Sequence, residues 1–291
     1  MRERRRAIGV EAVRVAAVNW KLKPCAGLDD LLAHFDELTM RCVTEGADLI
    51  VFPEHFVLEL LWDREVDVRK MPRNLAQWDE DLEGHFSDLA VKTGTTLVAG
   101  SHFAMEGGEP RNVCVVAFPD GSTRRQSKIV LTQFESAEWG LAAGDSLSVL
   151  GDPKFAVTIC YDCEFPESGR AVAEAGCLLQ CIPAFTEARR GFNRVRWSAH
   201  ARAVENQIYV VHSSLVGSLG REPVPSAVGS SAVIAPCVEP FPESAILAET
   251  AWCEEGVAIA DLDLDMLLAA RDAGDVRNWN DRRQFNVRLD G

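Results

Sequence analysis

Short runs of almost entirely apolar residues recur along the chain, and they constrain its fold more than any other feature. Several of them contain almost no polar residue, which is typical of strands covered on both faces. They therefore predict a β-sheet or sheets enclosed between other layers. The runs occupy residues 13–18, 49–52, 96–99, 113–118, 155–160, 178–182, 208–211, 232–235 and 257–260.

Helical patterns lie between some of these runs. Over 28–43 the apolar residues repeat on one face, and Gly46 is placed to end the helix. Pro166 suits the first turn of a second helix, which Gly176 ends. Two more helices are predicted at about 193–206 and 263–272.

The segment 94–160 contains mainly strand and loop patterns, so helices do not alternate with strands throughout. This order predicts an α/β sandwich of mixed sheets rather than a doubly wound fold. No linker rich in Gly, Ser or Pro divides the 291 residues. We therefore expect one domain over 12–285, a basic arm at 1–11 and a short tail at 286–291.

The basic arm has four arginines among its first six residues. Glu11 and Arg14 interrupt the apolar stretch that a signal peptide would need. A short solvated arm is therefore the favoured interpretation. A transit peptide is the alternative, although Glu3 and the lack of serine count against it.

The charge and the cysteines limit the class of protein. A net charge of −14 argues against binding to nucleic acid or to an anionic membrane. No apolar run reaches the roughly 18 residues that a membrane-spanning helix needs. The nine cysteines are odd in number and scattered through apolar segments, which favours free thiols in a reducing compartment. We expect a cytoplasmic protein.

Three polar residues end or follow strand-like segments and carry the chemistry. Glu54 follows one apolar run, Cys160 ends another, and Lys128 lies between them in the chain. A free thiol is only about 3% ionised at pH 7, so a nearby carboxylate is needed to take its proton during attack. A lysine ammonium and the N–H that follows the cysteine suit an oxyanion. Together they would form an acyl-transfer site without histidine, metal or cofactor. Each feature alone is more typical of an inert buried thiol, an ordinary turn or a solvated lysine, so the pattern by itself makes this site a minor hypothesis.

These residues lie in segments that resemble the nitrilase superfamily of carbon–nitrogen hydrolases, whose catalytic residues are a glutamate, a lysine and a cysteine in that order. The similarity covers about residues 12–285 and is closest to a branch often joined to an N-terminal acetyltransferase-like domain. The matching segments are LIVFPE at 49–54, KIVLTQFE at 128–135, ICYDCEFPE at 159–167, ARAVENQ at 201–207 and GSSAVIAP at 229–236.

The resemblance implies the fold and the reaction. The expected fold is a four-layer α-β-β-α sandwich with two mixed β-sheets, paired through helices into a homodimer or a larger homo-oligomer. The expected reaction is hydrolysis of a small amide through an acyl-enzyme on Cys160. Glu54 would be the base, and Lys128 and the Tyr161 N–H would hold the oxyanion. A nitrile or an N-carbamoyl compound is the alternative substrate, and an inactive scaffold of the same fold is the non-enzyme alternative.

Further roles are assigned from the resemblance. A second catalytic glutamate is expected to orient the lysine, and Glu135 is favoured over Glu138. Arg170 and Glu205 are expected to form an ion pair that braces the turn at the cysteine. Substrate contacts are predicted for Tyr161, Phe185, Thr186 and Trp139.

Some features of the sequence allow other interpretations. Many relatives carry a His-Trp pair where this chain has Arg194-Val195. Arg194 and Arg196 would suit an acidic substrate, but a solvated helix face is favoured. Cys177 and Cys181 would be about 13 Å apart on an extended strand, which argues against a zinc site formed with Cys160 and Cys163. A redox pair of Cys160 and Cys163 is also disfavoured, because the thioredoxin context is missing.

Overall fold

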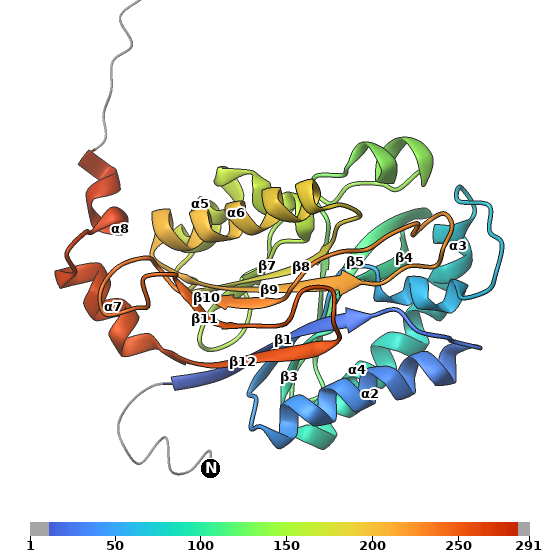
Figure 1. Cartoon of the computed structure of the whole chain (residues 1–291), viewed down its shortest axis with the longest axis horizontal. Coiled ribbons are helices and arrows are strands. Elements are labelled where there is room, and N and C mark those ends of the chain that lie inside the picture. Colours follow the sequence, from blue (N-terminus) through green and yellow to red (C-terminus); the bar gives the residue numbers. More distant parts are fainter. Residues whose placement is uncertain (1–11, 285–291) are drawn as a thin grey trace, which may run out of the picture.

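Two mixed β-sheets lie face to face between two layers of helices in the computed structural model, which describes residues 12–284 (Figure 1). The four-layer prediction is confirmed in this arrangement. The basic arm and the C-terminal tail predicted above lie outside the described residues. No helix in the described part of the chain is long and apolar enough to cross a membrane.

The first sheet is built around the parallel strands β1 and β2 and the long strand β5. Strand β12 pairs antiparallel with β1, β3 joins β2 to β5, and both β4 and β6 pair antiparallel with β5. Its strands are β1 (Ala12–Lys21), β2 (Leu49–Val51), β3 (Thr96–Val98), β4 (His102–Glu106), β5 (Glu109–Ala117), β6 (Thr123–Ser127) and β12 (Gly256–Asp263).

The second sheet has the order β7-β8-β9-β10-β11 and is parallel from β7 to β9. It meets the first sheet at the end of β1, where Trp20 and Lys21 pair with Leu215 and Val216. Its strands are β7 (Phe155–Val157), β8 (Leu179–Phe185), β9 (Tyr209–Val216), β10 (Ala232–Ile234) and β11 (Ile246–Glu249).

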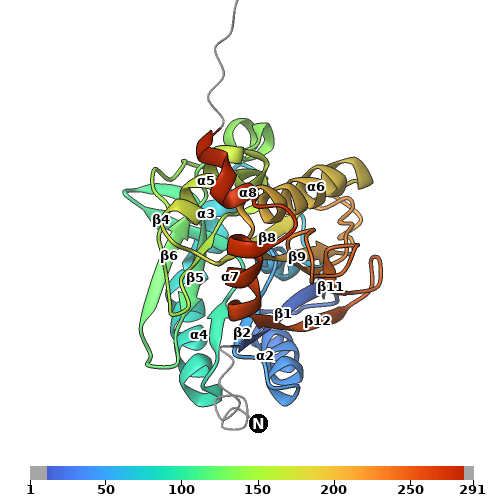
Figure 2. The ribbon, with the colours of Figure 1, turned by 90° about the vertical axis from the view of Figure 1, so that its left-hand side faces the viewer.

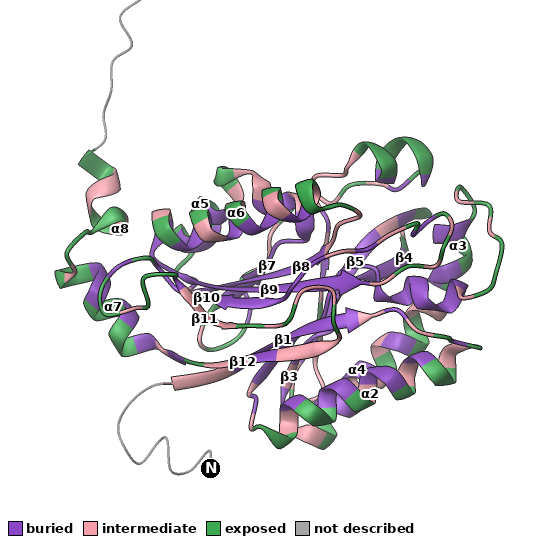
Figure 3. Ribbon diagram, viewed as in Figure 1, coloured by how far each residue is buried: buried purple, intermediate pink, exposed green. Residues whose placement is uncertain are grey.

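Helices cover the outer face of each sheet (Figures 1 and 3). Those on the first sheet are α2 (Leu28–Thr44), α3 (Met71–Leu75) and α4 (Asp79–Thr93), and those on the second are α5 (Pro166–Glu174) and α6 (Arg189–Asn206). The chain closes with α7 (Leu264–Ala273), α8 (Asn278–Asp281) and η5 (Arg282–Gln284). Short 3₁₀ or π-helical segments are η1 (Phe56–Leu61), η2 (Ala76–Trp78), η3 (Phe134–Glu138) and η4 (Cys160–Glu164).

Strand β1 shows why an all-apolar strand fits between two layers. Successive side chains of a strand point to opposite faces. Val15 and Ala17 pack in the core between the two sheets. Ala16 and Val18 pack with the helices below the first sheet. Both faces of β1 are therefore buried away from solvent along these residues, as its apolar run predicted.

The nine predicted strands are all present, with shifted ends, but the predicted strand 155–160 stops at Val157. Thr158 and Ile159 lead out of it, and Cys160 begins η4 rather than ending a strand. The helix predicted from 193 begins at Arg189. The strands β4, β6 and β11 and the helices α3, α4 and α8 were not predicted from the sequence.

Candidate active site

Glu54 is fixed by a tight turn after β2. It pairs with Ser101 in a single parallel bridge, and the next N–H, from His55, donates to the Ser101 carbonyl at 2.9 Å. The neighbouring Gly100 has a φ of +70°, and a Cβ there would lie 2.2 Å from the Pro53 carbonyl oxygen. Only glycine fits this position, because it needs both the left-handed backbone and the close approach.

Cys160 lies on a sharp turn between β7 and η4, with a φ of +47°. A non-glycine residue with positive φ stores strain and is often found at a functional site. The Sγ donates to the Phe185 carbonyl at 3.5 Å, and the residue is 5% exposed. Burial and the charge of Glu54 raise the pKa of the thiol well above its usual value, although Lys128 opposes them. The resting thiol is therefore neutral at pH 7.

Lys128 follows β6, and its ammonium joins two buried carboxylates. The Nζ lies 2.8 Å from Oε1 of Glu54 and 2.7 Å from Oε2 of Glu135. Burial alone would lower the pKa of the lysine, but Glu135 and Glu54 outweigh it and hold the pKa well above its usual value. The side chain is therefore a permanent cation beside Cys160.

Glu135, and not Glu138, belongs to this cluster. Glu135 lies in η3 and is 3% exposed, and its Oε2 accepts from the Thr132 N–H at 2.9 Å and the Thr132 hydroxyl at 3.0 Å. Burial would raise its pKa, but Lys128 and His55 lower it far below its usual range. The carboxylate is therefore charged, while Glu138, in the same turn, is exposed.

Two residues of the cluster were missed in the sequence. Asn112 of β5 donates from Nδ2 to Oε1 of Glu54 at 2.9 Å and to Oε1 of Glu135 at 3.0 Å. His55 lies beside them, with Nε2 3.5 Å from Oε1 of Glu135 and a φ of +57°. Asn112 lies inside an apolar strand pattern, so only the polar interruption of that pattern signals it. His55 directly follows the glutamate motif.

Asp162 is a third residue that the sequence analysis did not single out, and it joins two catalytic segments. Its Oδ1 accepts from the Val130 N–H at 2.7 Å, and its Oδ2 accepts from the Ile159 N–H at 3.1 Å. Burial raises its pKa to about 6, although these N–H groups and Lys128 act in the opposite direction. The segment after Lys128 is thereby held against the turn that carries Cys160.

The residues predicted to contact substrate are in different environments. Phe185 is beside Cys160 and donates its N–H to Oε2 of Glu54 at 2.9 Å. Tyr161 follows the cysteine and packs edge-on against Phe165. Trp139 is buried and packs edge-on against His55. Thr186 uses its hydroxyl to donate to the Val228 carbonyl at 2.9 Å. Substrate contact by these four stays a prediction.

The predicted ion pair of Arg170 and Glu205 is wrong. Arg170 donates to the main-chain carbonyl of Glu205 at 3.4 Å, while the Glu205 carboxylate pairs with Arg202. Arg202 is the residue that braces the turn, because its Nε donates to the Cys163 carbonyl at 3.0 Å. The sequence argument failed because Arg202, one helical turn before Glu205, is the nearer cation.

Arg194 and Arg196 differ in their surroundings. Arg194 is exposed and lies 3.4 Å from Glu164, which fits a solvated helix face. Arg196 does not fit it, because it is 6% exposed and pairs with Glu249 at 3.0 Å and the Ser230 carbonyl at 2.6 Å. Arg196 therefore anchors α6 to the segment that precedes β10 and to the last residue of β11.

All nine cysteines are free, and seven of them are buried. Among residues 12–284, Glu54, His55 and Glu135 are the one group of three with ligand atoms close enough to hold a metal ion. The Lys128 ammonium already contacts both of these carboxylates and supplies the positive charge between them.

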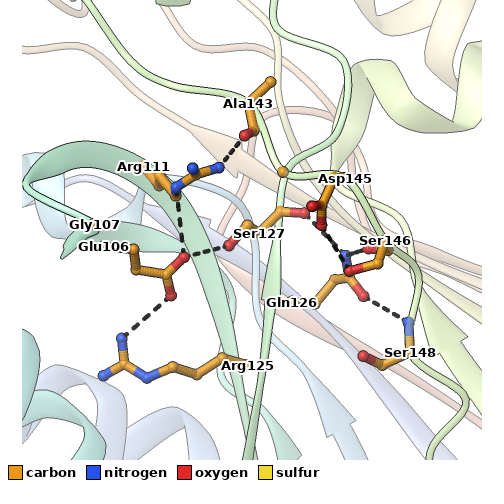
Figure 4. A pocket seen from close by; sticks show the side chains of 11 residues that line it. Glu106, Gly107, Arg111, Arg125, Gln126, Ser127, Ala143, Asp145, Ser146 and Ser148 are labelled. Atoms are coloured by element: carbon orange, nitrogen blue, oxygen red, sulfur yellow. Dashed lines mark hydrogen bonds and ion pairs between the residues drawn. The ribbon is translucent and has the colours of Figure 1, made fainter.

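A separate cavity of about 350 Å³ lies beside β5 and β6, next to the strand residues that precede Asn112 and Lys128 (Figure 4). Its two arginines are already paired. Arg111 lies 3.7 Å from Glu106, and Arg125 lies 3.8 Å from Glu106 and 2.9 Å from Asp79. This cavity therefore offers a ligand no unpaired cation.

The four-layer fold and the buried thiol, carboxylates and ammonium suit an acyl-transferring hydrolase. Residues 14–272 match the family model described as carbon–nitrogen hydrolase. The chain therefore belongs to the carbon–nitrogen hydrolase family, within the nitrilase superfamily. At the level of the family, the prediction of a hydrolytic enzyme is confirmed.

Individual relatives agree with this membership. The chain is 34% identical to the probable hydrolase YhcX of Bacillus subtilis over 94% of its own length, and it spans 54% of the length of that relative. It is 31% identical to omega-amidase NIT2 of Danio rerio, covering 83% of this chain and 86% of the relative. The crystal structure of Saccharomyces cerevisiae Nit3 matches with a TM-score of 0.74 and 25% identity, covering 90% and 94% of the two chains.

Proposed function

We propose that the protein hydrolyses a carbon–nitrogen bond of a small amide through an acyl-enzyme on Cys160. One observation carries the proposal. The Lys128 ammonium is held between Glu54 and Glu135 at 2.8 and 2.7 Å, and the main chain of Phe185 contacts Glu54 through its N–H and Cys160 through its carbonyl. A nucleophile, a base and an oxyanion donor thus meet in one buried group.

The first half-reaction begins with a neutral thiol. As Sγ attacks the amide carbon, Glu54 takes the thiol proton, because burial makes a free thiolate unfavourable before attack. The oxyanion is held by the Lys128 ammonium and the Tyr161 N–H. Tyr161 lies in the first turn of η4, where an N–H has no acceptor within the helix. One such donor contributes about 3–4 kcal/mol to the transition state.

The second half-reaction returns the proton and consumes water. Glu54 protonates the departing ammonia or amine as the carbon–nitrogen bond breaks, which leaves a thioester on Cys160. Glu54 then takes a proton from water as the water oxygen attacks the thioester carbonyl. The thiolate leaves, regains its proton and frees a carboxylic acid. Glu135 orients Lys128 throughout. Asn112 keeps the two carboxylates in position by donating to both of them.

The substrate class rests on the relatives. The relative named omega-amidase favours an amide over a nitrile or an N-carbamoyl compound. Membership of the branch that is often joined to an acetyltransferase-like domain stays part of the proposal, and the chain spans only 54% of the length of the Bacillus hydrolase. Partners and location remain proposals of the same kind: a homodimer formed through α5 and α6, where Trp197 is 67% exposed, in the cytoplasm.

A panel of small amides, nitriles and N-carbamoyl compounds tests the function. Ammonia release is measured for the wild-type chain and for Cys160→Ala as the matched control. Ammonia release from amides by the wild type, with none by Cys160→Ala, supports the proposal. Release from nitriles alone would replace the amide with a nitrile, and equal release by both proteins would contradict the role of Cys160. No release from any class would favour the inactive scaffold.

A further inference from the structure

A second cavity has a volume of about 570 Å³ and lies apart from the catalytic residues named above. It forms where α8 and η5 lie against α5 and α6, beside α7 (Figure 2). The residues that line it are Arg170, Glu174, Glu205, Asn278, Arg282 and Arg283. None of them belongs to the catalytic group.

Arginines from three elements converge around Trp279 at this cavity. The guanidinium carbon of Arg282 lies 3.4 Å from the centre of the Trp279 ring, that of Arg271 lies at 4.8 Å and that of Arg170 at 5.8 Å. The main chain of Trp279 is fixed, because its backbone N–H donates to Oε1 of Gln207 at 3.0 Å. The indole thus acts as a flat platform that holds the guanidinium groups in place.

These arginines have few carboxylate partners. Among the described residues, the four arginines 170, 271, 282 and 283 make one carboxylate contact, between Arg282 and Glu174 at 3.8 Å. Arg271 donates to the main-chain carbonyls of Asn206 and Gln207 instead. The chain has 44 acidic and 30 basic residues, so a shortage of carboxylates does not explain this arrangement.

Arg170, which lines the cavity, has a hydrogen-bond donor that is not satisfied. Its Nη1 is buried without a hydrogen-bond partner among the described atoms. Its Nη2 makes only a long bond of 3.4 Å to the Glu205 carbonyl, since the Glu205 carboxylate is occupied by Arg202. A buried charged donor without an acceptor is costly, and native proteins rarely leave one unmatched.

The like charges also act on one another. Burial and the nearby Arg282 lower the pKa of Arg271 to about 10. Burial, Arg283 and Arg170 lower the pKa of Arg282. The cavity of Figure 4 differs, because carboxylates already neutralise both of its arginines. Carboxylates therefore balance the arginines of the first cavity, whereas the arginines at the second have one carboxylate contact among the described residues.

We propose that the cavity between α5, α6 and α8 binds a small oxyanion of the phosphate type, either free phosphate or the phosphoryl group of a phosphate ester. A guanidinium presents a planar fork of N–H donors that matches two oxygens of a phosphate. Arg170, Arg282 and Arg283 supply such donors from two sides of the cavity, and Asn278 adds an amide. A phosphate dianion offsets more of the local positive charge than one carboxylate does. This site does not depend on the proposed reaction.

Isothermal titration calorimetry with inorganic phosphate tests the site, at constant ionic strength set with chloride. The expected result for the full chain is saturable binding of about one phosphate, with a dissociation constant below about 1 mM. Arg282→Gln and Arg283→Gln should each weaken binding by about tenfold or more, because each removes a charged donor. Arg283 is exposed, so its variant tests the site even if Arg282→Gln unfolds.

Arg277→Gln is the matched control, since Arg277 lies just before α8 but does not line the cavity and pairs with Asp281. It should bind phosphate within about twofold of the wild type. Glycerol phosphate, titrated in parallel, separates the two sources. Tighter binding of the ester supports a phosphorylated ligand, and equal or weaker binding supports free phosphate. Absence of saturable binding of either probe, or an equal loss in Arg277→Gln and Arg283→Gln, would overturn the proposal.

Discussion

The main-chain N–H of Phe185 donates to Oε2 of Glu54 at 2.9 Å, across the two sheets. The carbonyl of the same residue accepts from the Cys160 thiol at 3.5 Å. At the end of β8, the backbone of one residue therefore contacts the proposed base through its N–H and the proposed nucleophile through its carbonyl. Because these contacts use the backbone, they do not depend on the identity of the side chain at 185.

Replacement of Lys128 tests the oxyanion donor. Lys128→Ala removes the ammonium, and Lys128→Arg presents a wider planar group where Glu54 and Glu135 leave room for a compact one. We expect kcat to fall by about a hundredfold or more in both. Lys92→Ala, which changes an exposed lysine of α4, should retain full activity. Retention of more than about a tenth of the rate in both Lys128 variants would assign this lysine no part in the reaction.

Replacement of Glu135 tests the second carboxylate against its neighbour. Glu135→Gln removes the charge that contacts Lys128, and we expect kcat to fall by about a hundredfold. Because Glu135 is buried, its variant should also melt at a lower temperature, so the rate is measured well below that temperature. Glu138→Gln alters an exposed residue of the same turn and should match the wild type. An inactive Glu138 variant would reverse the assignment.

Asp162→Asn tests the link between the catalytic segments. The carboxylate accepts from Val130 with one oxygen and from Ile159 with the other. An amide keeps one acceptor and turns an NH₂ group toward the other N–H. We expect a loss of about 1–3 kcal/mol in the free energy of unfolding, measured by urea titration, and a lower kcat. Unchanged stability would mean that the link between these segments is dispensable.

The pH dependence of alkylation tests the resting state of the thiol. The pKa of Cys160 is raised by burial and by Glu54, so the thiolate becomes populated only as the pH rises toward that value. We expect the rate of Cys160 alkylation by iodoacetamide, followed by peptide mass spectrometry, to increase without a plateau through about pH 9. A plateau at neutral pH would instead indicate a preformed thiolate–ammonium pair.

Much of the site was predictable because its chemistry lies next to strong local patterns. Glu54 and Cys160 follow buried strands, and Glu135 lies within the segment that begins at Lys128. Asn112 was not predictable in this way. Its contact with Glu54 depends on how β5 lies in the sheet, across 58 residues of chain.

The parts of the fold that were missed have weak or polar patterns. Strand β6 has the sequence TRRQS, which contains no apolar residue, so no apolar pattern predicts a strand there. It forms through its backbone pairing with β5. Helix α4 begins with three acidic residues, and its buried face consists of Leu82, Phe86, Leu89 and Ala90. That spacing is helical, and it was available in the sequence. The partner of Glu205 could also have been predicted, because Arg202 lies three residues before it in the same predicted helix.

The central claim is that Cys160 carries the acyl group, and mass spectrometry of a trapped intermediate tests it most directly. The wild type, Cys160→Ala and Cys163→Ala are each mixed with an amide that the panel shows to be turned over, quenched in acid and digested. Cys163 is buried three residues away and its Sγ contacts the Val195 carbonyl, so its variant is the matched control. We expect the mass of the acyl group on the peptide that contains Cys160 in the wild type and in Cys163→Ala, and no adduct or turnover in Cys160→Ala. Turnover by folded Cys160→Ala, or an acyl group on another residue, would contradict the account.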